Sequence, residues 1–117
     1  AIKYTKQREA FGRELIKFQH TRFELAELKA EVLSIKTTVD YCVQQLIDGA
    51  IDPATASMAK LVAADKGVSV VDRCVQFFGG YGYMMEYPIA RAYAAARVNK
   101  IYGGTSEIMK EIISRSL

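Results

Sequence analysis

The stretch "FQHTRFELAELKAEVLSIKTTVDYCVQQLI", Phe18–Ile47, predicts one long amphipathic helix. Its apolar residues recur every three or four positions, as on one face of a helix: Leu25, Leu28, Val32, Ile35, Val39, Cys42 and Leu46. Gly49 stands where helices commonly end on a glycine in the left-handed conformation. At the rise of an α-helix, this segment runs to about 45 Å, so it sets the length of the whole fold.

A second long helix follows after a short linker. Asp52-Pro53 is typical of a helix start, with an N-cap and then proline at the first helical position. The apolar spacing continues to the glycines at 79 and 80, through Leu61, Ala64, Val68, Val71, Val75 and Phe78. Two such helices joined by a short linker are expected to pack antiparallel.

The rest of the chain is also helical in pattern. We expect a third helix from Pro88 to about Asn99 and a fourth from Thr105 to the end, while residues 1–7 look like the last turns of another helix. Alternating strand patterns are nearly absent. The prediction is an all-α, up-and-down bundle of the four-helix type, with one helix incomplete, in a 117-residue piece of a longer chain.

Composition excludes several classes of protein. The net charge is only +3, and basic residues alternate with acidic ones, which argues against a nucleic-acid surface. No apolar run is long enough to span a bilayer. The single histidine, His20, excludes a histidine-rich metal site. Cys42 and Cys74 lie inside helical patterns and do not form a CxxC motif. We expect them to be buried free thiols in a reducing compartment, with a disulfide as the less favoured alternative. The glycine run at 79–82 is not a dinucleotide-binding loop of the GxGxxG type. Such a loop follows a strand, whereas this run follows a helix, and Met85 stands where the third glycine is needed.

Three glycine-bearing loops contain more polar groups than a helical bundle needs: "QREAFG" at 7–12, "QFFGGYGY" at 76–83 and "IYGGTSEI" at 101–108. Each alone has a plain explanation, as an ordinary turn, a helix C-cap or a helix N-cap. Together they favour a binding role, because glycines allow close approach and a helix start offers free N–H groups to an anionic or polar ligand.

In this order, with "FQ" before the long helix and "EYPIARAY" before the last loop, the segments resemble the C-terminal helical domain of the acyl-CoA dehydrogenases along essentially the whole chain. "GGYGYMMEYPIARAY" and "IYGGTSEIMKEI" are most similar to the long-chain branch. The resemblance implies that residues 1–117 are the C-terminal bundle of a flavoprotein that also has an N-terminal helical domain and a middle β-domain, both lying outside this chain.

The family resemblance also implies a chemistry. Such enzymes oxidise an acyl-CoA to the trans-2-enoyl-CoA and pass a hydride to FAD, with electron-transferring flavoprotein as the expected acceptor. They are commonly tetramers in which FAD lies across a subunit boundary, and the compartment is the bacterial cytoplasm or the mitochondrial matrix. Acyl chain length is left open.

Site residues follow from the resemblance. Residues implied to contact FAD largely from the neighbouring subunit are Arg8, Glu9, Ala10, Phe11, Phe18, Gln19, Gln76, Phe77, Phe78, Gly79 and Gly80. Those implied to hold FAD within their own subunit are Thr105, Ser106 and Glu107. Tyr102, Gly103 and Gly104 are implied to border the acyl thioester.

The catalytic base of many relatives falls at Gly103, which cannot take a proton. Glu107 and Glu86 are poor substitutes, so the resemblance to the long-chain branch implies a glutamate upstream of residue 1 and no catalytic residue in this chain, which alone is predicted to be inactive. Two alternatives stay open: a helical oligomerisation module that has lost catalysis, and a sibling of the acyl-CoA oxidase type.

Overall fold

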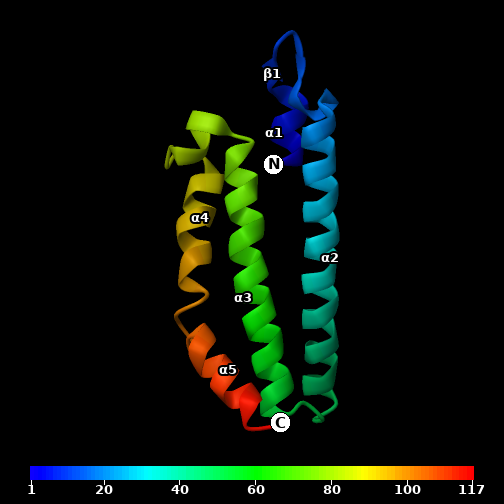
Figure 1. Ribbon diagram of the computed structural model, residues 1–117, viewed down its shortest axis with the longest axis vertical. Coiled ribbons are helices and arrows are strands. Elements are labelled where there is room, and N and C mark those ends of the chain that lie inside the picture. The colour runs from blue at the N-terminus through cyan, green and yellow to red at the C-terminus, as the bar shows by residue number, and fades with distance from the viewer.

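The computed structural model describes all 117 residues. The elements run in the order α1 (Ile2–Gln7), β1 (Glu9–Ala10), β2 (Arg13–Glu14), η1 (Leu15–Lys17), α2 (Gln19–Ile47), α3 (Pro53–Gln76), η2 (Gly79–Tyr83), α4 (Pro88–Val98) and α5 (Ser106–Ser114). Figure 1 shows α2 and α3 as long antiparallel columns, with α4 and α5 stacked into a third column beside α3 and α1 near the upper end of α2. The molecule is elongated, with extents of 55 × 24 × 24 Å. The predicted all-α, up-and-down architecture is confirmed.

The helix ends form for the reasons that the sequence indicated. Asp52 Oδ1 accepts a hydrogen bond from the Thr55 amide at 2.9 Å, which caps α3. Gly49 has φ +67°, and the amide of Ala50 donates to the carbonyl of Gln45 at 2.8 Å. This bond closes α2 in the way that a left-handed glycine allows. Thr105 caps α5.

One local feature differs from the prediction. The turn at 7–12 is a small antiparallel hairpin in which Glu9 pairs with Glu14 and Ala10 with Arg13. Its two-residue loop has positive φ at both Phe11 (+53°) and Gly12 (+76°), as tight hairpins require. The sequence did not predict this hairpin, because phenylalanine, here Phe11, rarely occupies the left-handed region.

Only part of the apolar face of α2 is buried. Leu25, Leu28 and Cys42 are buried, but Val32, Val39 and Leu46 are 48%, 38% and 65% exposed. In this chain α2 packs mainly on α3, which covers only one side of a wider apolar stripe. We call the uncovered side the outer α2 face and define it by four residues, which are Val32, Val39, Val43 and Leu46.

Small side chains fill the contacts of α3 with α4 and α5. Ala59, Ala64, Ala90 and Ala96 are buried there, together with Met109. Cys42 and Cys74 are both free thiols, as predicted, but Cys74 is only half-buried, against the expectation of two buried ones. No helix has the length and apolarity needed to cross a membrane.

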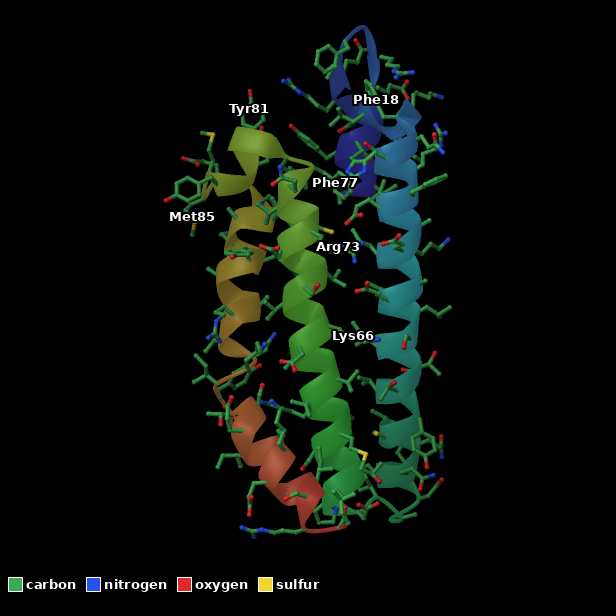
Figure 2. The ribbon with its side chains drawn as sticks, viewed as in Figure 1. Phe18, Lys66, Arg73, Phe77, Tyr81 and Met85 are labelled. Atoms are coloured by element: carbon green, nitrogen blue, oxygen red, sulfur yellow. The ribbon has the colours of Figure 1, made fainter.

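Arg73 joins the two long helices electrostatically (Figure 2). Its guanidinium donates to Glu24, to Glu31 at 2.8 Å and to Glu27 at 2.9 Å. These three carboxylates lie along one side of α2, so a single side chain of α3 cross-links about two turns of its neighbour.

Candidate functional site

An open cleft of about 610 Å³ lies where α1, η1 and the end of α3 meet at the upper end of the molecule. It is lined by Tyr4, Arg8, Leu15, Gln76, Phe77, Phe78, Gly79, Gly80, Tyr81 and Met84. Six of these ten are residues predicted from the family resemblance to contact FAD: Arg8 and the run 76–80. We call this cleft the upper cleft.

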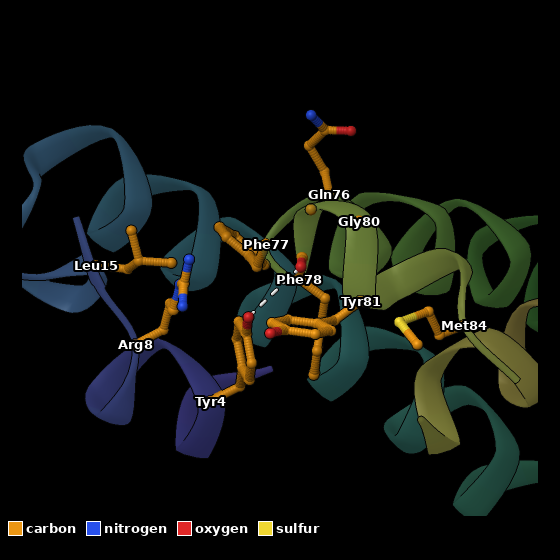
Figure 3. A pocket seen from close by; sticks show the side chains of 10 residues that line it. Tyr4, Arg8, Leu15, Gln76, Phe77, Phe78, Gly80, Tyr81 and Met84 are labelled. Carbon is orange, nitrogen blue, oxygen red and sulfur yellow. Dashed lines mark hydrogen bonds between the residues drawn. The ribbon is translucent and has the colours of Figure 1, made fainter. Parts of the chain in front are cut away.

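Aromatic rings build the wall of the upper cleft (Figure 3). The rings of Tyr4 and Phe78 stack with centroids 4.1 Å apart, and the Tyr4 hydroxyl donates to the Phe78 carbonyl at 3.5 Å. Tyr81 stacks on Tyr87 at 4.9 Å. The contact between Tyr4 and Phe78 ties α1 to the turn after α3, so this part of the wall is held by packing between distant parts of the chain.

Arg8 is the cation of the upper cleft. Its guanidinium lies 6.0 Å from the centre of the Tyr81 ring, and none of the ion pairs in the structure includes it. The backbone around it is fixed, since its amide donates to Tyr4 and its carbonyl accepts from Leu15. An exposed arginine on a rigid backbone beside bare glycine main chain is suited to an anion such as a pyrophosphate.

Other predicted contacts lie beside the cleft and do not line it. Glu9, Ala10 and Phe11 form the hairpin, whose Phe11 is 96% exposed. Phe18 and Gln19 stand at the start of α2, where the Phe18 ring lies under the Arg13 guanidinium at 4.0 Å.

The remaining predicted residues form a separate group, the lower loop, at residues 102–107, which ends in the first turn of α5. Gly103 and Gly104 have φ of +64° and +99°, and the Thr105 hydroxyl accepts from the Ile108 amide at 3.3 Å. The lower loop packs on α3 through Asp65, which is 11 residues before Gln76. That spacing separates the lower loop from the upper cleft by about 16 Å along α3.

No carboxylate in the lower loop has the properties of a raised-pKa base. Glu107 is exposed, and bonds from its own backbone N–H and from the Thr105 hydroxyl lower its pKa. A lowered pKa makes a carboxylate a weaker proton acceptor. Glu86 is also exposed and belongs to the turn before α4, where its carbonyl accepts from Arg91 at 3.1 Å. No cluster of histidine, cysteine and carboxylate side chains is suited to a metal ion.

Comparison with known protein families shows to which family this chain belongs. The family model described as "Acyl-CoA dehydrogenase, C-terminal domain" matches residues 1–117. This chain belongs to the acyl-CoA dehydrogenase family. The mitochondrial long-chain specific acyl-CoA dehydrogenase of Mus musculus is 49% identical over 114 residues, which cover 97% of this chain and 26% of that protein.

Solved structures agree with this family assignment. An acyl-CoA dehydrogenase from Geobacillus kaustophilus is 41% identical with a TM-score of 0.95, covering 98% of this chain and 30% of that one. The butyryl-CoA dehydrogenase of Megasphaera elsdenii is 36% identical with a TM-score of 0.94, at the same coverages. This acyl-CoA dehydrogenase domain therefore spans about a quarter to a third of the length of such relatives.

The structure of this acyl-CoA dehydrogenase domain adds site residues that the sequence did not indicate. Tyr4 lines the upper cleft from α1, and Lys60, Asp65 and Lys100 hold the lower loop. Lys60 and Asp65 lie in the middle of a regular helix with no local motif around them. Only the packing of α5 on α3 identifies them.

Proposed function

We propose that this chain is the FAD-binding and assembly domain of a flavin-dependent acyl-CoA dehydrogenase, which oxidises an acyl-CoA to the trans-2-enoyl-CoA. The observation that carries the proposal is the upper cleft, in which an unpaired arginine, aromatic rings and bare glycine backbone converge. When bound, FAD supplies the acceptor for the hydride that leaves the acyl chain.

The residues of the upper cleft fit a flavin nucleotide. Arg8 offers several N–H donors to a pyrophosphate. A Cβ built at Gly79 or Gly80 meets no atom within 4 Å, so that side of the backbone is open to a ligand. Phe77, Phe78 and Tyr81 supply flat apolar surfaces against which a ring system can pack.

The lower loop is proposed to serve the flavin and thioester of the same subunit, while the upper cleft serves those of a neighbour. The family resemblance is the basis of this division, and the two groups lie about 16 Å apart along α3. In this proposal Thr105, Ser106 and Glu107 hold the flavin, and Tyr102, Gly103 and Gly104 border the thioester.

The proton acceptor is proposed to lie outside this chain, on the helix that leads into α1. Gly103 carries no side chain that can accept a proton, and the low pKa of Glu107 makes it unsuited to the task. The chain alone is accordingly proposed to have no dehydrogenase activity.

The relatives support further choices. Identity of 49% to a long-chain specific enzyme favours a long acyl chain. The CarC subunit of a caffeyl-CoA reductase–Etf complex from Acetobacterium woodii is 37% identical, which supports electron-transferring flavoprotein as the redox partner. Three relatives are mitochondrial and others are bacterial, which supports the matrix or the bacterial cytoplasm as the compartment.

A second function has a specific observation behind it. The outer α2 face exposes apolar side chains that the rest of the chain covers only in part. The second candidate function is an oligomerisation module that has lost catalysis. Such a module would use the outer α2 face for association and would have no use for Arg8, the free arginine of the upper cleft.

FAD retention tests the proposal. The complete enzyme that contains this domain should purify with FAD, and its flavin absorbance should bleach when a long-chain acyl-CoA is added. The Arg8→Ala variant should bind FAD about 10- to 100-fold more weakly, as expected for the loss of a charged hydrogen bond. The control is Arg115→Ala, which removes an exposed arginine at the opposite end of the molecule. A complete protein that holds no FAD after reconstitution would leave only the oligomerisation module.

A further inference from the structure

Two charged residues of α3 hold the lower loop: Asp65 binds on both sides of its glycine pair, and Lys60 binds at the second glycine. The Lys60 ammonium donates a hydrogen bond to the carbonyl of Gly104. Asp65 accepts from the Lys100 ammonium at 2.8 Å and from the Ser106 hydroxyl at 3.4 Å. These bonds lower the pKa of Asp65, chiefly through Lys100, and keep it ionised. The loop before α5 is therefore anchored to a rigid helix on both sides of its glycine pair.

The charge of Lys60 has no carboxylate partner. None of the ion pairs in the structure includes Lys60, and its only hydrogen bond is the one to Gly104. The side chain is half-buried between α3 and the loop. A hydrogen bond from an ammonium to a carbonyl is stronger than one between neutral groups, so Lys60 both restrains and polarises this peptide.

The restraint matters because the loop backbone is otherwise free to rotate. Gly103 and Gly104 are both in the left-handed region and have no Cβ to limit them. The peptide between Gly104 and Thr105 is trans, so its N–H points away from its carbonyl oxygen. By holding the Gly104 oxygen toward α3, Lys60 directs the Thr105 N–H away from α3.

The N–H groups on this side of the loop are unused within the chain. The amides of Gly103, Gly104 and Thr105 donate to no other group, whereas the next amide, that of Ser106, donates to Lys100 at 3.2 Å. Successive free N–H groups around left-handed residues make a concave site for a negatively charged or strongly polar oxygen. Their usefulness depends on their direction, which the bond from Lys60 fixes.

We propose that Lys60 is a positioning residue for the dehydrogenase reaction: its ammonium holds and polarises the Gly104 carbonyl, and so orients the free amides of the lower loop toward the bound thioester and flavin. The inference rests on the proposed function, since the lower loop borders the thioester only within that proposal. It does not depend on where the proton acceptor lies.

The test uses the complete enzyme with Lys60→Met, which keeps an unbranched side chain only one atom shorter and removes its charge. We expect kcat to fall about 10- to 100-fold, because misplaced donors lose much of their effect on the reacting group, while KM and FAD content change little. Lys60→Arg keeps a cationic donor and should recover most of the lost kcat. The matched control is Lys66→Met, an exposed lysine on the same helix about 120° away around its axis.

Hydrogen exchange provides a second measurement that needs no catalysis. Peptides covering residues 99–108 should exchange faster in Lys60→Met than in the wild type, because the Ser106 amide loses part of its protection. Peptides of α2 should be unchanged. The Lys66→Met control should match the wild type throughout.

The outcomes separate this inference from the proposed function. Unchanged kcat, unchanged loop exchange, or a loss of kcat that follows a matching loss of FAD or of melting temperature would each overturn it. If the wild-type enzyme holds no FAD and oxidises no acyl-CoA, the proposed function fails, and loop exchange alone decides whether Lys60 holds the loop.

Discussion

Gly103 and Gly104 differ in what a side chain would meet, although both have positive φ. A Cβ at Gly103 has no neighbour within 4 Å, while one at Gly104 would lie 2.5 Å from Met109 Cε. Alanine at Gly103 should therefore destabilise the protein by about 1 kcal/mol through the backbone alone. Alanine at Gly104 should cost somewhat more, about 1.5–2 kcal/mol, since the end of the flexible Met109 side chain must also move.

Urea unfolding checks this pair of glycine variants. The control is Gly67→Ala, because Gly67 lies inside α3 with open space around its Cβ. That change should stabilise the protein by about 0.5–1 kcal/mol through helix propensity. Equal losses at Gly103 and Gly104 would show that the contact with Met109 is not tight.

Single residues with a local signature were predictable from the sequence. The caps at Asp52 and Thr105 and the glycine at 49 follow from rules that involve only neighbouring residues. Lys60 and Asp65 were not predictable, because their partners Gly104 and Ser106 are more than 40 positions away. A sequence pattern specifies helix ends better than it specifies which polar side chain meets which loop.

At the scale of elements, Arg73 is the main polar link between α2 and α3. The hydrogen bond from Arg73 lowers the pKa of Glu24, and the three carboxylates raise the pKa of the guanidinium. A carboxyl whose pKa is lowered by folding stabilises the native state above its ordinary pKa and loses this effect as pH falls through the lowered value.

The Arg73→Met variant should therefore lower the melting temperature at pH 7 and have a smaller effect at acidic pH, once the pH has fallen through the lowered pKa of Glu24. Lys36→Met is the control, since Lys36 pairs with Asp40 at 2.5 Å within α2 at an exposed site and should change the melting temperature little at either pH. A loss for Arg73→Met that is independent of pH would indicate that packing of the side chain, and not its charge, joins the helices.

The elements also show where apolar spacing misleads. The period along Phe18–Ile47 gave the helix and its approximate ends correctly, but it does not show that Val32, Val39 and Leu46 stay partly exposed in this chain. Periodicity identifies the apolar side of a helix and does not say which element covers it. The wide stripe on α2 has room for two neighbours, and the chain supplies only one.

At the scale of the whole molecule, the separated site groups and the outer α2 face point to the same arrangement. The upper cleft and the lower loop are about 16 Å apart along α3, and from the family resemblance one copy of the chain is proposed to contribute to two flavin sites. Such a site is complete only when copies associate. Exposed apolar side chains gathered on one helix face are typical of a surface that another protein covers.

We therefore expect the complete enzyme to be a homo-oligomer. Its association tests whether a second copy covers the outer α2 face, or whether the helix that ends in α1, which already borders Val32, covers it within the same chain. Leu46→Glu places a charge at a side chain that is 65% exposed in this chain, so it should not disturb the fold but should be costly in an interface. Light scattering after size exclusion should show a smaller assembly. The control is Ser34→Glu, on another face of α2, which should keep the wild-type mass.

The same Leu46→Glu variant should also retain less FAD, although Leu46 lies at the opposite end of α2 from Arg8. A ligand that binds between copies is linked to their association, so weakening one weakens the other. The measurement is the flavin-to-protein absorbance ratio during dilution. As the protein is diluted, Leu46→Glu should begin to lose flavin at a higher protein concentration than Ser34→Glu does. Full FAD retention by a monomeric variant would show that one copy holds the flavin by itself, and the proposed sharing of sites between copies would be wrong.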